Sequence, residues 1–262
     1  MFQLIRLDIY NNGRLVSHQR KFILFKKVKI SNEKPSIIVS NKKIIDGEET
    51  NKGLRYIVDV ALGDTYANLQ FRGTNNGFKG RVPGSNWVVM LPKVEVTGEI
   101  KVKEKKLLVK GIGYHDHNWG ITPCTILNNY GWIWGKLYSK NYTVIWAKVY
   151  KTREKGFPLM VVTRENQDGF INIEPRDFKI DLKGVRKQYK YYGLPSGFTI
   201  TAVKNSDVFI DVDVDVVDVH YSNVLGVIKY WRYHVKNTGV IRLNGSEEYI
   251  NNVDIAEYLV LK

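Results

Sequence analysis

The decapeptide GIGYHDHNWG, residues 111–120, gathers in one place side chains that can do acid, base or metal chemistry. Along an extended strand, successive side chains point to opposite faces. The two faces of this segment therefore carry different chemistries. One face carries Tyr114, Asp116 and Asn118, and the other carries His115 and His117.

The first face indicates general acid catalysis by Asp116. Burial in an apolar cavity disfavours the charged form of a carboxyl group and raises its pKa, so the group can hold a proton near neutral pH. Tyr114 and Asn118 would then orient the acid or hydrogen-bond a substrate oxygen. The alternative interpretation is structural, with Asp116 accepting hydrogen bonds from neighbouring backbone N–H groups. The residues alone leave both interpretations open.

The second face raises the question of a metal site. Two histidines at positions i and i+2 of a strand can chelate a metal when a third ligand completes the set. A glutamate shortly after His117 would supply that ligand, but the next acidic residue is Glu154. We therefore predict no metal, and we expect both imidazoles to be hydrogen-bonded structural groups.

Two later segments keep their aromatic residues on one face each. Such faces can form a floor for a long polyene or a ring system. Packing in the core is the alternative, because aromatic side chains dominate protein cores. The residues are Tyr130, Trp132, Trp134 and Tyr138 in the first segment, and Tyr142, Trp146 and Tyr150 in the second.

The elements that position these residues are predicted to be strands. Apolar and polar residues alternate along segments such as LRYIVDVAL (54–62) and VEVTGEIKV (94–102), and helical periodicity is hard to find. Turn signals such as Asn244-Gly245 separate the segments. In DVFIDVDVDVVDVH the phase of alternation shifts at Val216-Val217, which predicts a β-bulge. We predict an all-β protein whose strands close into barrels.

A weak internal repeat indicates two such barrels. The tetrapeptide TGEI at 97–100 recurs as TGVI at 238–241, and LIRLDIY, ending at Tyr10, aligns with VIWAKVY, ending at Tyr150. We therefore predict consecutive barrels, residues 1–126 and 127–262. The segment GWIWGKLY precedes the second copy and has no counterpart before the first. The first barrel is thus expected to lack its opening strand.

The composition limits the partners. The chain has 262 residues and a formal net charge of +14, which suggests nucleic acid or an anionic membrane. However, the lysines mostly alternate with apolar residues, and only Lys103–Lys106 and Lys183–Lys190 form clusters. We predict no nucleic-acid partner. The single cysteine, Cys124, excludes an internal disulfide, and a cytoplasmic location is expected.

The motif GxGYHDHNWG resembles the signature of a lipocalin-like superfamily. This superfamily includes carotenoid 1,2-hydratases (hydroxyneurosporene synthases), AttH-type proteins, kievitone hydratases and fungal Diels–Alderases. A looser likeness covers most of the chain, at Tyr56–Phe71, Trp87–Pro92, Gly98, Trp132–Gly135, Asn244-Gly245 and Glu257-Tyr258. The resemblance implies two calycin-type antiparallel barrels and a pocket for isoprenoid or polyketide molecules. Hydratase members of the superfamily protonate an isolated C=C bond and add water to the cation, and the resemblance implies this chemistry for the chain.

Carried over to this sequence, the resemblance implies that Asp116 is the proton donor and Tyr114 its neighbour in the pocket. Trp87 would be a wall that stabilises a carbocation through its π face. No cofactor is implied. The remaining predicted substrate-binding residues are His117, Asn118, Trp132 and Trp134.

Taken together, these patterns predict a cofactor-independent hydratase or isomerase-like enzyme, a carbon–oxygen lyase if it hydrates. It would act on a hydrophobic, terpenoid or carotenoid-like small molecule by acid catalysis from Asp116. The alternative is a non-catalytic carrier of such a molecule, which needs the same pocket walls. Peripheral contact with a membrane is one route by which either protein would acquire its ligand. The oligomeric state stays open.

Overall fold

The computed structural model is almost entirely made of strands. Strands account for 79% of it and helices for 3%, which confirms the predicted all-β class. The short helix α1 (Pro123–Asn128) spans six residues, and no helix in the described part of the chain is long and apolar enough to cross a membrane. The structure describes residues 2–31, 33–51, 53–73, 78–83, 85–120, 123–165, 167, 169–184, 194–224 and 228–261.

The chain forms two compact units that are interleaved along the sequence. Two long strands, β9 (Ser85–Val102) and β10 (Lys105–Trp119), contribute residues to both. Compact units and evolutionary domains need not share boundaries, so the contiguous domains 1–126 and 127–262 stay a prediction. Unit 1 consists of Met1–Asn76 and Leu91–His115, and unit 2 consists of Gly77–Met90 and Asp116–Lys262.

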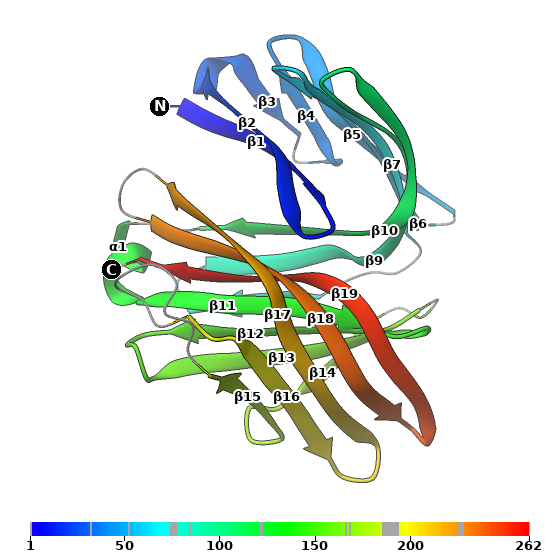
Figure 1. Ribbon diagram of the computed structural model, residues 1–262, viewed down its shortest axis with the longest axis vertical. Helices are drawn as coiled ribbons and strands as arrows, with labels where there is room; N and C mark the ends of the chain where they lie inside the picture. Colours follow the sequence, from blue (N-terminus) through cyan, green and yellow to red (C-terminus); the bar gives the residue numbers. More distant parts are fainter. Residues whose placement is uncertain are drawn as a thin grey trace. The chain divides into compact units, whose positions relative to one another are not determined.

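Unit 1 is built on an antiparallel sheet in the order β10-β9-β7-β6-β5-β4-β3 (Figure 1). Inward-facing residues such as Tyr56 and Ala67 are buried, as expected for a half-buried strand with period two. Gly113 of the decapeptide leaves room for a core ring, because a Cβ there would lie 2.8 Å from Phe71. The other elements are β1 (Phe2–Asn11), β2 (Arg14–Leu24), η1 (Phe25–Lys27), β3 (Val28–Ile30), β4 (Ser36–Val39), β5 (Lys42–Thr50), β6 (Gly53–Leu62) and β7 (Thr65–Gly73).

Strands β1 and β2 form a separate two-stranded sheet. Side chains tie this hairpin to the turn between β6 and β7: Ser17 Oγ lies 2.5 Å from Thr65 Oγ1, and Gln19 Nε2 donates to Asp64 Oδ1 at 2.9 Å. Within the described residues, the ladder partner of β1 is β2 alone, and side chains rather than strand pairing connect the hairpin to the larger sheet.

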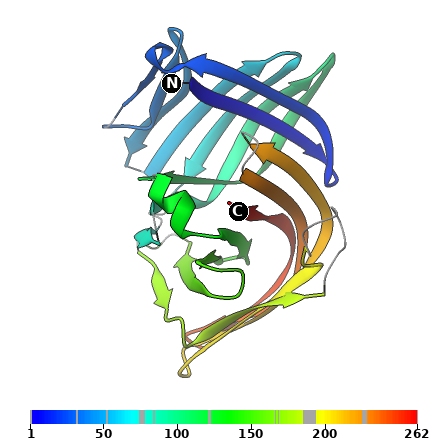
Figure 2. The ribbon, with the colours of Figure 1, turned by 90° about the vertical axis from the view of Figure 1, so that its left-hand side faces the viewer.

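Unit 2 contains a nine-stranded sheet, in the order β14-β13-β12-β11-β19-β18-β17-β16-β15, that curls into a nearly closed barrel (Figure 2). Its two edge strands are joined by residues 174–177 alone, so they cannot lie far apart. The strands are β11 (Gly131–Tyr138), β12 (Tyr142–Tyr150), β13 (Gly156–Arg164), β14 (Ile171–Ile173), β15 (Phe178–Lys183), β16 (Gly197–Lys204), β17 (Val208–Val224), β18 (Ile228–Leu243) and β19 (Ser246–Val260), with β8 (Lys79–Val82) paired to β9.

Aromatic side chains fill the interior of this barrel. Trp146, Phe198, Trp231 and Tyr233 are all fully buried and belong to one apolar cluster. Strand β17 carries the predicted bulge, because its register against β18 shifts between Val216 and Asp218. The fully buried interior shows that the barrel core of unit 2 is packed by its own side chains.

The internal repeat has a structural counterpart at its glycines. Gly98 has a φ of +151°, and a Cβ there would lie 2.1 Å from the backbone oxygen of Asn68. Gly239, its match in the repeat, has a φ of +158°, and its Cβ would lie 2.1 Å from the backbone oxygen of Asp211. Only glycine fits such a close approach in this region of φ. The two units thus share a local backbone feature.

We therefore expect Gly239→Ala to lower the free energy of unfolding by about 2 kcal/mol or more, since it adds both strain and a clash. Chemical denaturation measures the loss. The control is Gly111→Ala, where the new Cβ meets nothing within 4 Å, and its effect should stay within about 0.5 kcal/mol. Equal effects of the two substitutions would show that the close approach is not real.

Candidate functional site

The centre of the candidate site is a hydrogen bond between Trp87 and Asp116. Trp87 Nε1 donates to Asp116 Oδ2 at 2.8 Å. Both residues belong to unit 2, although 28 residues separate them in the sequence. Trp87 lies on the inward face of β9, where alternate residues are buried, and only 4% of it is exposed. Asp116 on β10 is half-buried.

Aromatic rings surround the indole of Trp87. The ring of Phe78 meets it edge to face, with centroids 5.9 Å apart, and Phe170 packs in the same way on Phe78 at 5.1 Å. Trp134 of β11 lies on another side, with its ring centroid 6.5 Å from that of Trp87. Asp116 therefore accepts a hydrogen bond from an indole that is itself packed among aromatic rings.

Trp134 is held by a second carboxylate. Its Nε1 donates to Glu257 Oε2 at 2.8 Å, and the other oxygen of Glu257 forms an ion pair with Arg232 at 2.6 Å. The Tyr230 hydroxyl also donates to that oxygen. Burial, together with the adjacent Glu257 charge, raises the pKa of the Tyr230 hydroxyl, so Tyr230 stays a donor. This network fixes the orientation of Trp134.

The site lies on the outer face of the unit 2 barrel. Along β11, Ile133 and Leu137 point into the apolar core, so Trp132 and Trp134 point to the opposite face. The predicted aromatic floor is thus divided. Tyr142, Trp146 and Tyr150 pack in the core, as the alternative interpretation expected.

The structure distributes the other predicted site residues over both units. Tyr114 is half-buried and belongs to unit 1, together with His115, whose ring meets Tyr56 edge to face at 5.1 Å. His117 and Asn118 are exposed, and the His117 ring stacks on Trp119 at 5.6 Å. Trp132 is half-buried and pairs in register with Leu259. Their roles in binding or catalysis stay predictions.

Two further features bear on the sequence predictions. Among the described residues, no group of three or more histidine, cysteine, aspartate or glutamate side chains could hold a metal ion. The side chain of Cys124, and residues 185–190 of the predicted basic cluster, lie outside the described residues.

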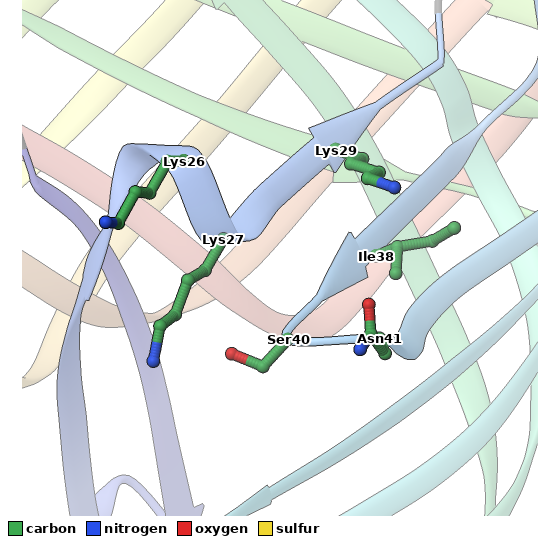
Figure 3. A pocket seen from close by; sticks show the side chains of 6 residues that line it. All are labelled: Lys26, Lys27, Lys29, Ile38, Ser40 and Asn41. Carbon is green, nitrogen blue, oxygen red and sulfur yellow. The ribbon is translucent and has the colours of Figure 1, made fainter.

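Two hollows of the surface lie in unit 1, and Asp116 lines neither of them. One has a volume of about 300 Å³ and is lined by three lysines together with Ile38, Ser40 and Asn41 (Figure 3). The other, of about 600 Å³, lies where Gly98 makes its close approach, between Tyr66, Asn68 and Leu108.

Sequence reasoning missed two parts of this site. The hydrogen bond from the Trp87 N–H group to Asp116 was not predicted, and the expected role of the Trp87 π face stays a prediction. The network of Glu257, Arg232 and Tyr230 was not predicted. The alternation Tyr230-x-Arg232 places both side chains on one strand face, but only the register of β18 against β19 sets Glu257 opposite Arg232.

Comparison with known proteins bears out the fold. No family model matches the sequence. The crystal structure of a putative AttH from Nitrosomonas europaea superimposes with a TM-score of 0.67, covering 94% of this chain and 76% of that one. The chain has an AttH-like, lipocalin-like fold. The sequence identity is 13%, so this likeness establishes the fold alone.

Other comparisons agree with this AttH-like assignment. The structure of CghA with Sch210972 matches with a TM-score of 0.61 and 10% identity, over 98% of this chain and 79% of that one. Kievitone hydratase from Nectria haematococca matches with a TM-score of 0.59 and 11% identity, over 99% of this chain and 84% of that one. These neighbours share the fold that the resemblance of the decapeptide motif implied.

A curated relative gives a local sequence match. Hydroxyneurosporene dehydrogenase from Chlorobaculum tepidum is 34% identical over 70 residues. The matched region spans 24% of this chain and 18% of that protein. Because the match covers so little of the relative, the activity of that protein is not assigned to this chain.

Proposed function

We propose that this AttH-like chain is a cofactor-independent hydratase or isomerase-like enzyme for a hydrophobic small molecule, with Asp116 as its general acid. The observation that carries the proposal is the hydrogen bond from Trp87 to Asp116, inside a cluster of aromatic rings. A hydratase of the same fold supports the reaction class. A terpenoid or carotenoid-like substrate fits the aromatic surroundings and the curated relative.

The indole N–H determines which oxygen of Asp116 carries the acidic proton. An indole nitrogen can donate a hydrogen bond but cannot accept one. Oδ2 must therefore be the acceptor, and in the neutral acid the proton resides on Oδ1. Trp87 would thus hold the carboxyl group in one orientation, with its O–H directed away from the indole.

The reaction then follows as a balanced pair of proton transfers. Asp116 donates its Oδ1 proton to one carbon of a C=C bond, and the other carbon becomes a cation. Water adds to the cation, and the proton that this water loses returns to the Asp116 carboxylate. If the cation instead loses a proton from a neighbouring carbon to the Asp116 carboxylate, the product is an isomer. Neither route needs a redox or carrier group.

The aromatic cluster would stabilise the cation between these steps. The π faces of Trp and Phe attract cations, and the attraction grows where water is excluded. Trp134 would be kept in place by Glu257, whose oxygens already bind Trp134, Arg232 and Tyr230. In this arrangement Glu257 positions a ring and takes no part in proton transfer.

The proposal is tested by incubating the protein with a panel of long-chain polyenes and analysing the products by mass spectrometry. A product that has gained one water, or an isomer of the substrate, supports it. Tight binding without any product would instead support the non-catalytic carrier, which the same aromatic walls would suit.

The role of Trp87 gives a separate prediction. Trp87→Phe keeps an aromatic ring but removes the N–H donor, so we expect kcat to fall about tenfold to a hundredfold with little change in KM. Steady-state kinetics measure both constants. The matched control is Trp119→Phe, because Trp119 is a partly exposed tryptophan of the same decapeptide. An unchanged kcat in Trp87→Phe would mean that the ring of Trp87 only lines the site and that its N–H group does not contribute to catalysis.

A further inference from the structure

One stretch of unit 1 combines strong positive charge with exposed apolar side chains. Residues 9–32 contain no aspartate or glutamate. Their basic side chains gather toward the end of β2 and in the elements that follow. The six are Arg14, Arg20, Lys21, Lys26, Lys27 and Lys29.

The apolar residues of this stretch are unusually open to solvent. Phe22 is 54% exposed, Phe25 is 52% exposed and Ile30 is 57% exposed. Ser17 and Ile23 are buried on one face of β2, so Phe22 projects from the other. Exposed apolar residues that occur singly need no explanation, but a contiguous group indicates an interaction surface.

The strand pairing enlarges this group. Leu4 of β1 lies directly opposite Phe22 in the ladder and is 42% exposed. Leu24, two residues further along β2, is 39% exposed. The exposed apolar residues of the hairpin therefore span both of its strands, and the exposed Phe25 and Ile30 follow along the chain in η1 and β3.

Lysines of the same stretch surround a hollow of about 300 Å³. Lys26 and Lys27 come from η1 and Lys29 from β3, as Figure 3 shows. The turn after β4 supplies Ser40, whose backbone N–H donates to the Lys27 carbonyl at 2.8 Å. This hydrogen bond holds the turn against the lysines.

These three lysines differ from others in unit 1. Lys42 pairs with Asp59 at 2.8 Å, and Lys43 pairs with Asp46 at 2.9 Å. By contrast, within the described part of the chain no carboxylate forms an ion pair with the lysines of the hollow. Their positive charge is thus available to an anionic partner.

We propose that residues 20–30, together with Leu4, form a docking surface for an anionic lipid bilayer. Lysines next to exposed aromatic and aliphatic residues suit this partner, because phosphates meet the ammonium groups while the apolar side chains enter the boundary of the acyl chains. A single-stranded nucleic acid would use the aromatic rings by stacking but would leave Leu4, Leu24 and Ile30 without a role. The combination of lysines with both aromatic and aliphatic side chains therefore suits a lipid bilayer better than a nucleic acid.

The use of this surface rests on the proposed function, since an apolar substrate partitions into bilayers and must be collected there. Binding to the bilayer does not itself require turnover. Asp116→Asn should therefore bind vesicles as well as the wild type does, so the two proposals can fail independently.

The first test is co-sedimentation with phosphatidylcholine vesicles that contain or lack phosphatidylglycerol. We expect binding only to the anionic vesicles, and weaker binding as the salt concentration rises. Lys26→Gln/Lys27→Gln should weaken this binding about 30-fold. Lys151→Gln/Lys155→Gln removes the same charge from exposed positions elsewhere and should bind nearly as the wild type does. Equal losses in both double variants would overturn the proposal.

The second test concerns insertion of the apolar side chains. Phe22→Ser/Phe25→Ser should weaken binding to anionic vesicles about tenfold or more, whereas Leu108→Ser/Tyr249→Ser, at residues 85% and 80% exposed, should not. Circular dichroism and thermal unfolding show that each variant is folded. Wild-type binding by Phe22→Ser/Phe25→Ser would overturn the proposal. An RNA homopolymer that displaces the vesicles, and whose binding falls in both Lys26→Gln/Lys27→Gln and Phe22→Ser/Phe25→Ser, would assign the surface to nucleic acid and overturn the proposal too.

Discussion

Asp116→Asn is expected to lower kcat by roughly 10²–10⁴-fold, the contribution of a positioned general acid, while the protein still binds its hydrophobic ligand. The amide has nearly the shape of the carboxyl group, and its carbonyl oxygen can accept the Trp87 N–H as Asp116 Oδ2 does. It has no acidic proton to donate to carbon. Steady-state kinetics measure the loss, and quenching of tryptophan fluorescence measures binding.

The matched control is Asp213→Asn on β17. Asp213 is an exposed carboxylate that accepts hydrogen bonds from Lys183 and Thr199, and its loss should leave kcat unchanged. If Asp116→Asn keeps full turnover, the acid is another group. If it unfolds the protein instead, the structural interpretation of Asp116 is the correct one, with the carboxyl group serving to tie down its surroundings.

The largest effect on stability is expected from Lys136→Met. Lys136 Nζ lies 2.6 and 2.5 Å from the two carboxylate oxygens of Asp254, and the side chains are only 8% and 6% exposed. The β11–β19 ladder runs to Gly135 opposite Ala256, so this ion pair continues the link between the strands. Removing one partner leaves a buried charge, which costs about 3–5 kcal/mol of unfolding free energy.

Urea denaturation near neutral pH measures this loss. The control is Lys183→Met, which breaks the exposed ion pair between Lys183 and Asp213 and should cost no more than about 1 kcal/mol. A second variant, Lys136→Met/Asp254→Leu, should recover much of the stability, because no charge is then left buried. Similar losses in Lys136→Met and Lys183→Met would contradict the burial of the first pair.

The cost of Lys136→Met should also depend on pH. Burial holds the pKa of Asp254 above its ordinary value, although Lys136 opposes this rise. A carboxyl group whose pKa is raised in the folded protein favours folding at low pH, and this stability is lost as pH rises through the folded pKa. Without Lys136 the pKa of Asp254 rises further, so the deficit of the variant should be smaller at about pH 4 than at neutrality. A deficit that is constant with pH would contradict this reading.

The local patterns of the sequence were sufficient to predict the all-β class, whereas the lipocalin-like fold was implied by the resemblance of the decapeptide motif. Alternation with period two gave the strands, and a shift of phase at Val216-Val217 gave the bulge in β17. These features depend on neighbours in the chain, which sequence reasoning can follow. The glycines of the repeat, Gly98 and Gly239, were matched by sequence alone and share one backbone geometry.

The contacts of the site could not be predicted in the same way. Whether Trp87 meets Asp116 depends on the register between β9 and β10, and a slip of one residue would turn either side chain to the opposite face. The Lys136–Asp254 pair left one signal, a lysine inside the otherwise apolar strand GWIWGKLY. It gave no indication of the partner, which lies on a distant strand.

The docking surface was missed for a different reason. Lys27 and Lys29 alternate with Val28 and Ile30, as most lysines of the chain alternate with apolar residues, and this pattern is typical of a strand with one solvated face. The sequence therefore gave no reason to count Lys26, Lys27 and Lys29 as a cluster. Only the exposure of Phe22 and Phe25, close to these lysines in the sequence, indicates a surface that can make both charged and apolar contacts.

The central claim is that Asp116 delivers a proton to carbon, and incorporation of deuterium from solvent tests it most directly. In D2O the wild-type protein should convert an accepted polyene into a product with one carbon-bound deuterium that does not wash out in H2O. Asp116→Asn, which still binds the polyene, should form this product roughly 10²–10⁴-fold more slowly. Deuterated product from this variant at the wild-type rate, or wild-type product without deuterium on carbon, would contradict the mechanism.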